Sequence, residues 1–120
     1  ITYLDVSNKS IIDLTGIEAF TALATLKCLD NQLTNLVLTN NTVLTTLHSR
    51  RKQLTSIDLS NNPLLVESDL SQNDLVIIHL EANDSLFILK IHQMLRLAEI
   101  LHIKLSDLVK EGRMNLMLFF

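Results

Sequence analysis

Residues 23–43 read LATLKCLDNQLTNLVLTNNTV, and the skeleton of this stretch decides the fold because it recurs along the chain. With Leu23 as position 1, Leu or Cys falls at positions 1, 4, 6 and 11, and Asn falls at position 9. The spacing L-x-x-L-x-[LC]-x-x-N-x-L returns about every 21 residues. Self-similarity at a period of this length predicts a solenoid of stacked, similar coils.

The skeleton marks five coils. Their position 1 residues are Ile1, Leu23, Leu44, Leu65 and Leu86. The second half of each central coil repeats part of this spacing, with two apolar residues followed by Asn. These second-half residues are Leu36, Leu38 and Asn41; Ile57, Leu59 and Asn62; and Ile78, Leu80 and Asn83.

This nested pattern resembles the leucine-rich repeat family, in the short 21-residue form of bacterial surface and secreted proteins (internalin-like or Bacteroidetes-like). Residues 13–20, DLTGIEAF, are similar to the first repeats of internalin-like chains. The resemblance covers roughly residues 1–91. It implies a leucine-rich-repeat solenoid: a right-handed superhelix with short parallel β-strands on the concave face and a mostly irregular convex side.

The positions of the repeat have physical roles. Side chains alternate between the two faces of a strand, so positions 4 and 6 should point into the core and positions 3 and 5 outward. The position 9 Asn should hydrogen-bond backbone groups where the chain turns. We expect parallel strands near residues 3–6, 25–28, 46–49, 67–70 and 88–91.

The third and fourth coils depart from the pattern in ways that predict a locally weak core. Ser49 and Ser68 fill slots where Leu or a similar residue is expected, and Lys52 replaces the turn Asn. Losing a buried Leu-sized group typically costs about 2–5 kcal/mol. A Ser native to its site should be better accommodated, so we expect a smaller deficit.

Residues 1–96 are assigned to the repeats, and the period changes in residues 97–120. Apolar residues from Leu97 to Val109 recur at spacings of three and four before Gly112, which predicts an amphipathic helix. A helix laid across the last coil would cover the open end of the solenoid. The alternative is a degenerate sixth coil, and residues 114–120 fit either a strand or an exposed apolar end.

Length and composition set further bounds. A chain of 120 residues is one domain, and a net charge of −3 with a pI near 5.7 provides no cationic surface for nucleic acid. The single Cys28 excludes an intrachain disulfide and a cysteine metal site. We expect no transmembrane segment, and no signal peptide precedes Ile1. Because the chain starts at position 1 of a repeat, we expect it to be a segment of a longer protein.

The expected concave face carries the candidate binding residues. Its outward positions mix charged, polar and apolar side chains, which suits the recognition of a protein or glycan partner. The candidate partner-binding residues are Lys27, Leu29, His48, Arg50, Arg51, Asp69, Lys90 and His92.

The densest feature of this face is the cationic run from His48 to Lys52. One interpretation is a site for an acidic partner loop or a sugar acid. The alternative is a solvated charge cluster balanced by Asp30, Glu67 and Asp69, because exposed ion pairs contribute only about 0–1 kcal/mol each.

A catalytic site has little support in the sequence. Cys28 and His48 suggest a nucleophile and its base, but positions 6 and 5 face opposite sides of a strand, which prevents the hydrogen bond that such a pair requires. An HExxH motif, a phosphate-binding loop and a GxSxG elbow are absent from the sequence. We therefore expect no enzymatic activity, cofactor or metal site in this segment.

Three functions fit these observations. The first is a binding module of a bacterial secreted or cell-surface protein that recognises a protein or glycan through its concave face; the resemblance implies an extracellular or cell-surface location. The second is the substrate-recognition arm of a larger bacterial effector enzyme whose catalytic domain lies outside this segment. The third is a structural spacer, which should tolerate any outward substitution.

Overall fold

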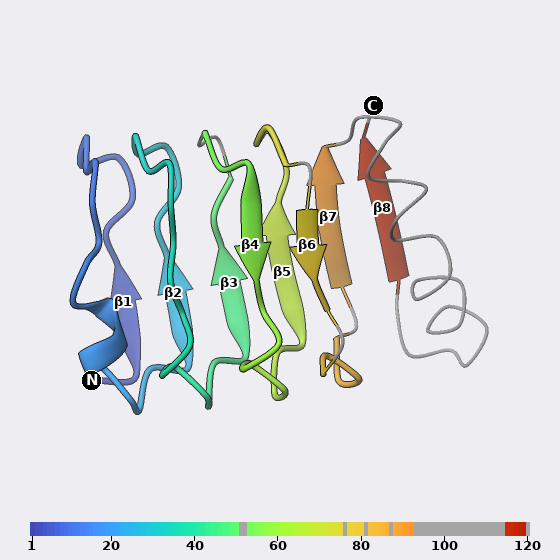
Figure 1. Cartoon of the computed structure of the whole chain (residues 1–120), viewed down its shortest axis with the longest axis horizontal. Coiled ribbons are helices and arrows are strands. Elements are labelled where there is room, and N and C mark those ends of the chain that lie inside the picture. The colour runs from blue at the N-terminus through green and yellow to red at the C-terminus, as the bar shows by residue number, and fades with distance from the viewer. Residues whose placement is uncertain (51–52, 76, 81, 87, 93–114, 120) are drawn as a thin grey trace.

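Parallel strands, one from each coil, form the main layer of the structure (Figure 1). The computed structural model describes residues 1–50, 53–75, 77–80, 82–86, 88–92 and 115–119. Within these residues the main sheet has six strands. In spatial order they are β1 (Tyr3–Asp5), β2 (Thr25–Lys27), β3 (Thr46–His48), β5 (Glu67–Leu70), β7 (Ile88–His92) and β8 (Asn115–Phe119).

The register of this sheet follows the repeat of the sequence. Leu4 pairs with Leu26, Leu26 with Leu47, and Leu47 with Ser68, so equal positions of successive coils lie side by side. The strands are parallel, and all five expected segments contain one. The predicted strand positions are therefore confirmed.

The core lies behind the sheet and consists mainly of leucine. In β2 and β3 the central residue is buried and its two neighbours are half-buried, which is the alternation expected of a strand with one face on a core. No single coil can bury its own leucines, so each coil packs them against the next. The fully buried large side chains are Leu23, Leu26, Leu33, Leu38, Leu44, Leu47, Leu54, Leu59, Leu65, Leu70, Leu75 and Leu86.

Buried asparagine side chains join successive coils where no sheet hydrogen bond reaches. The Asn31 Nδ2 donates to the carbonyls of Val6, in the first coil, and Cys28, at 2.9 and 3.1 Å. The Asn31 Oδ1 accepts from the backbone N–H groups of Lys9 and Ile11, both at 3.0 Å. The expected role of the position 9 Asn is confirmed.

A second column of asparagines repeats this connection in the other half of each coil. The Asn62 Nδ2 donates to the carbonyls of Leu38 and Asn41 at 3.0 and 2.9 Å. Asn41 and Asn83 make the equivalent pairs of bonds one coil earlier and one coil later. Each carboxamide thus gives a second donor to two carbonyls that also accept from a nearby backbone N–H group.

The side opposite the main sheet is more regular than the sequence suggested. Among the described residues, β4 (Ser56–Asp58) and β6 (Ile77–His79) form a second, two-stranded parallel sheet. Both strands centre on Ile, whose β-branched side chain favours an extended backbone, whereas the first two coils have Leu14 and Leu36 at this place. The first coil instead forms a short 3-10 helix, η1 (Ile17–Ala19), after Gly16, whose φ of 102° is readily adopted by glycine.

The C-terminal part of the chain contributes a sixth strand. β8 pairs with β7 in parallel, from Ile88 opposite Asn115 to His92 opposite Phe119. The tail therefore extends the sheet, as the strand interpretation proposed. The helix predicted between Leu97 and Gly112 lies outside the described residues.

The first prediction concerns Ser68, which is fully buried in the slot that Leu26 and Leu47 fill in their coils. Its hydroxyl makes no hydrogen bond with any described residue. Ser68→Leu should therefore raise the free energy of unfolding by about 1 kcal/mol, discounted for imperfect packing of the larger side chain. Urea unfolding measures this change, and a clear destabilisation would show that the neighbouring leucines already occupy the space.

The second prediction concerns the asparagine column. Asn62→Ala removes two hydrogen bonds to the carbonyls of Leu38 and Asn41, each of which keeps one backbone donor, and should lower the free energy of unfolding by about 2 kcal/mol. The Asn62 Oδ1 makes no hydrogen bond with any described residue, so the loss is confined to the two donated bonds. Asn61→Ala is the matched control, because Asn61 is exposed in the same turn and its loss should change stability by less than about 0.5 kcal/mol. Equal unfolding midpoints for the two variants would contradict the role of the column.

Candidate functional site

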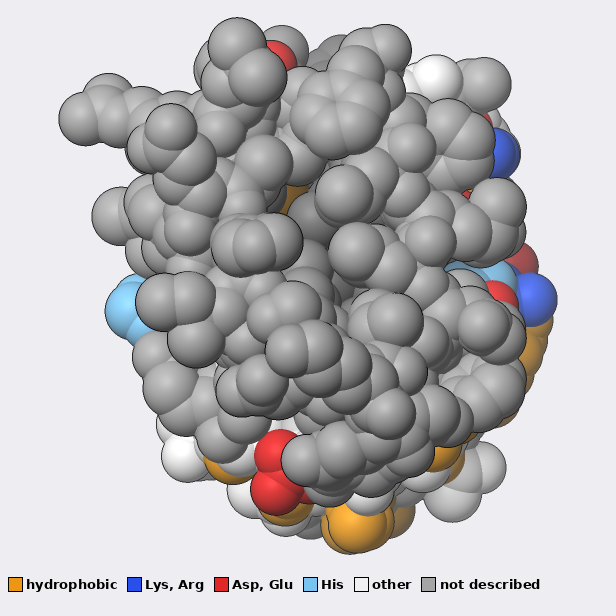
Figure 2. Space-filling view, turned by 90° about the vertical axis from the view of Figure 1, so that its right-hand side faces the viewer, with side chains coloured by type: hydrophobic (Ala, Val, Ile, Leu, Met, Phe, Trp, Pro, Cys, Tyr) orange, Lys and Arg blue, Asp and Glu red, His pale blue; other side chains and the backbone are white. Residues whose placement is uncertain are grey.

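The outward side chains of the main sheet form regular columns. We call the side chains at positions 3 and 5 of the first four coils the outer sheet face; all are half-buried or exposed, whereas the residues between them point inward. Viewed from the β8 end, Figure 2 shows basic, acidic and histidine side chains together along its right-hand margin. The outer sheet face consists of Tyr3, Asp5, Thr25, Lys27, Thr46, His48, Glu67 and Asp69.

Two contacts on this face join neighbouring strands. The Lys27 Nζ lies 5.7 Å from the centroid of the Tyr3 ring, within the range of a cation–π interaction. The His48 Nε2 lies 3.4 Å from the Glu67 Oε2. Because these groups are partly exposed, the contacts orient the side chains more than they stabilise the fold.

Asp5 is held ionised at one end of the face. Hydrogen bonds from the Ser7 hydroxyl and backbone N–H lower the pKa of the Asp5 carboxyl, with a smaller contribution from the positive charge of Lys27. The Ser7 Oγ also accepts a hydrogen bond from the backbone N–H of Leu29 at 3.1 Å. The first coil is thereby connected to the second through a carboxylate and a hydroxyl.

The same Asp-x-Ser/Thr turn recurs and was missed in the sequence. Asp13 accepts from the Thr15 hydroxyl at 2.6 Å, and Asp58 accepts from the Ser60 hydroxyl at 2.5 Å. These bonds lower the pKa of both carboxyls. The recurring D-x-[ST] spacing was the available signal, because Asp side chains cap their own backbone two residues later.

Five of the eight predicted binding residues have described side chains. Lys27, His48 and Asp69 belong to the outer sheet face, and Leu29 and Arg50 follow directly after β2 and β3. All five are half-buried, and the fold brings them together on three successive coils.

The other three predicted residues are only partly placed. Lys90 and His92 lie in β7, which pairs with β5 in the main sheet, and Arg51 lies outside the described residues, as does Lys52. The Arg50 Nε is buried and makes no hydrogen bond with any described residue.

Cys28 and His48 occupy opposite faces of the sheet, as predicted. Cys28 is fully buried, and its Sγ lies 3.6 Å from the backbone carbonyl of His48, whose side chain is partly exposed. No described group of three or more His, Cys, Asp or Glu residues could hold a metal ion. Within the described part of the chain, no helix is both long and apolar enough to cross a membrane.

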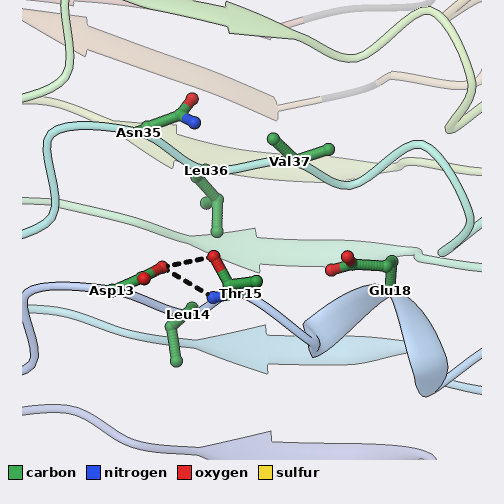
Figure 3. A pocket seen from close by; sticks show the side chains of 7 residues that line it. All are labelled: Asp13, Leu14, Thr15, Glu18, Asn35, Leu36 and Val37. Carbon is green, nitrogen blue, oxygen red and sulfur yellow. Dashed lines mark hydrogen bonds between the residues drawn. The ribbon is translucent and has the colours of Figure 1, made fainter.

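A surface pocket of about 260 Å³ lies on the other side of the molecule, between the first two coils (Figure 3). Both carboxylates in this pocket accept hydrogen bonds from the backbone of their own turns. Asp13 accepts from the Thr15 N–H, and Glu18 accepts from the Gly16 N–H at 3.1 Å. A neighbouring pocket, also of about 260 Å³, is lined by residues 35–39 and 56–58. Neither pocket brings together groups suited to acid–base or nucleophilic chemistry.

Comparison with known proteins supports the architecture. No protein-family model matches the chain, and no curated protein matches it. Among solved structures, the chain is similar to the functional domain of InlJ from Listeria monocytogenes, with 31% identity and a TM-score of 0.74. InlJ is an internalin, a leucine-rich repeat protein. This chain has a leucine-rich-repeat-like fold.

The similarity covers 78% of this chain and 20% of the InlJ chain. That structure is described as including a cysteine ladder. The present chain holds only Cys28 and therefore builds no such ladder of its own.

The third prediction concerns the ionisation of Asp5. Its folded pKa lies below the ordinary value of 3.8, so its stabilisation is complete above that value and is lost as the pH falls through the folded pKa. Ser7→Ala should raise the pKa of Asp5 toward its ordinary value, measured by NMR titration of the carboxyl carbon. Thr34→Ala, which removes an exposed hydroxyl elsewhere, should leave the Asp5 titration unchanged. The same Asp5 pKa in wild type and Ser7→Ala would refute the assigned cause.

Proposed function

We propose that this chain is a binding module of a bacterial secreted or cell-surface protein, and that it recognises a protein or glycan partner through the outer sheet face. The observation that carries the proposal is the set of in-register columns of polar and charged side chains on that face. Extended surfaces of this kind are what solenoids use for binding.

The rigidity of the face favours recognition. Its side chains project from short strands that are hydrogen-bonded on both sides in β2, β3 and β5, and each strand rests on fully buried residues. A surface that is already ordered loses little conformational entropy when a partner binds, which leaves more of the contact energy for affinity.

The ends of β2 and β3, beside the outer sheet face, favour an acidic group on the partner. Lys27 and Arg50 flank the half-buried Leu29, so two cations surround an apolar contact. Arg binds carboxylates through a planar fork of donors, and binding energy concentrates on Arg and apolar anchors near the centre of an interface. We therefore place the acidic group of the partner over β2 and β3.

The similarity to InlJ supports the bacterial and extracellular part of the proposal. Since the chain spans only 20% of that protein, the partner and the activity of the parent molecule are part of the proposal. The proposal assigns no enzymatic activity to this segment, because the only thiol of the chain is buried on the opposite face from His48.

The fourth prediction tests the arginines that follow β3. Arrays of proteins and bacterial or host glycans, probed with the labelled chain, identify a partner for titration. Combining Arg50→Ala with Arg51→Ala should weaken binding by about 2 kcal/mol or more, with the fold intact. The affinity of the wild type should also fall as the salt concentration rises.

The matched control is a single substitution that removes the same charge elsewhere. Lys9 is exposed in the turn after β1, so Lys9→Ala should bind like the wild type, whereas Arg50→Ala alone should bind more weakly. Equal affinities for the wild type and the double variant, at low and high salt, would show that the two arginines are not part of the binding site. The candidates would then be the apolar residues at positions of the repeat that the sequence predicts to be outward, which are Leu29, Phe87 and Ile88.

A further inference from the structure

Exposed apolar side chains line the edge at which the chain enters the strands. Figure 2 shows hydrophobic side chains along the lower margin of the molecule, which is this edge in Figure 1. Val43 is 38% exposed and Leu64 is 49% exposed, although both are apolar. We call this set of exposed residues the apolar ridge: Phe20, Ala22, Val43, Pro63, Leu64 and Val66.

The apolar ridge is held on a regular lattice. Backbone N–H groups beside it donate from coil to coil: Ala24 to the Thr2 carbonyl, Thr45 to Ala24, and Val66 to Thr45, each at 2.8 Å. Neighbouring ridge residues are therefore separated by the spacing of adjacent strands, about 4.7–4.9 Å. None of the six side chains is ionisable.

This spacing favours a second copy of the chain. A partner helix repeats every 5.4 Å and would drift against the ridge by about 0.5–0.7 Å per coil. The ridge also lacks the cations that attract anionic lipid. A second copy of the chain carries the same spacing and would meet the ridge in step over its full length, without bringing one charge against another.

The side chains also increase in size along the ridge. Two copies of the ridge that run in opposite directions therefore place large side chains against small ones. Ala22, Val43 and Leu64 occupy one column on three successive coils. When two copies lie antiparallel about a twofold axis at Val43, each Leu64 faces the small Ala22 of the other copy. The polar Ser85, which continues the column in the next coil, then lies beyond the contact and stays in water.

We propose that the apolar ridge is a self-association surface, on which a second copy of this chain packs antiparallel about a twofold axis through Val43. The contact is isologous, because each copy uses the same residues. A ridge of six side chains is smaller than a standard interface of about 800 Å² per partner, so the dimer is weak and forms at high protein concentration. The outer sheet face remains free in both copies, which makes the dimer bivalent.

Sedimentation equilibrium over a concentration series of the whole chain tests the proposal. The wild type should show a reversible monomer–dimer equilibrium. Val43→Asp places two carboxylates against each other at the axis and should raise the dissociation constant at least about tenfold. Leu64→Asp should have a similar effect, because it buries a charge against Ala22.

The matched control is Val37→Asp. Val37 is 46% exposed, a fraction similar to that of Leu64. It lies away from the apolar ridge, on the side of the solenoid that carries β4. This variant should dimerise like the wild type, and unfolding curves for all three variants separate a loss of association from a loss of fold. In addition, Val43→Cys should form a disulfide-linked dimer with a mild thiol oxidant, whereas Val37→Cys should not; the native Cys28 is buried and does not compete.

Several outcomes would overturn the proposal. A wild type that stays monomeric at millimolar concentration rejects self-association, and flotation of that monomer with phosphatidylcholine vesicles would assign the ridge to a lipid surface. A dimer that Val43→Asp leaves intact, or that Val37→Asp disrupts equally, would place the contact elsewhere.

Discussion

The second, third and fourth coils are each attached to the coil before them by an asparagine carboxamide whose two N–H groups meet two backbone carbonyls. The carbonyls of Val6, Leu38 and Leu59 receive this donor from the next coil. The carbonyls of Leu38 and Leu59 also accept from backbone N–H groups, so each asparagine bond adds about 0.5–1.5 kcal/mol to the stacking of one coil on the next. The first coil has Lys9 and Phe20 in the two slots that hold Asn31 and Asn41 in the second coil, so both columns of donors begin at the second coil, and Lys52 interrupts the first column in the third coil.

This constraint sets the geometry of both candidate surfaces. The asparagine bonds and the sheet hydrogen bonds impose one spacing on every position of the repeat. The outer sheet face and the apolar ridge both follow this spacing, the first at positions 3 and 5 of the repeat and the second at positions on either side of position 1. Their side chains differ in chemistry, but neither surface needs a loop to be reshaped before a partner can bind.

The sequence was informative wherever a position is determined by the core. The spacing of Leu and Asn predicted the parallel strands, the inward slots and the asparagine bonds, because each is repeated at the period of the coil. The β4–β6 pairing was not predictable in the same way, since it depends on Ile57 and Ile78 replacing Leu in two adjacent coils only. The contacts of Lys27 with Tyr3 and of His48 with Glu67 escaped prediction because rotamers of exposed side chains are not specified by a period. The partner is less predictable still, since outward residues satisfy no rule of the fold.

The weakest part of the core lies under the most charged part of the outer sheet face. Ser49 stands between His48 and Arg50, and its buried hydroxyl has no hydrogen bond among the described residues. Ser68 has the same defect between Glu67 and Asp69 on the next strand. Natural proteins depart from the rules of stable packing mainly at functional sites, where selection for function outweighs selection for stability. The two serines therefore point to β3 and β5 as the part of the sheet shaped by something other than folding, and β3 is also one of the two strands over which we place the acidic group of the partner.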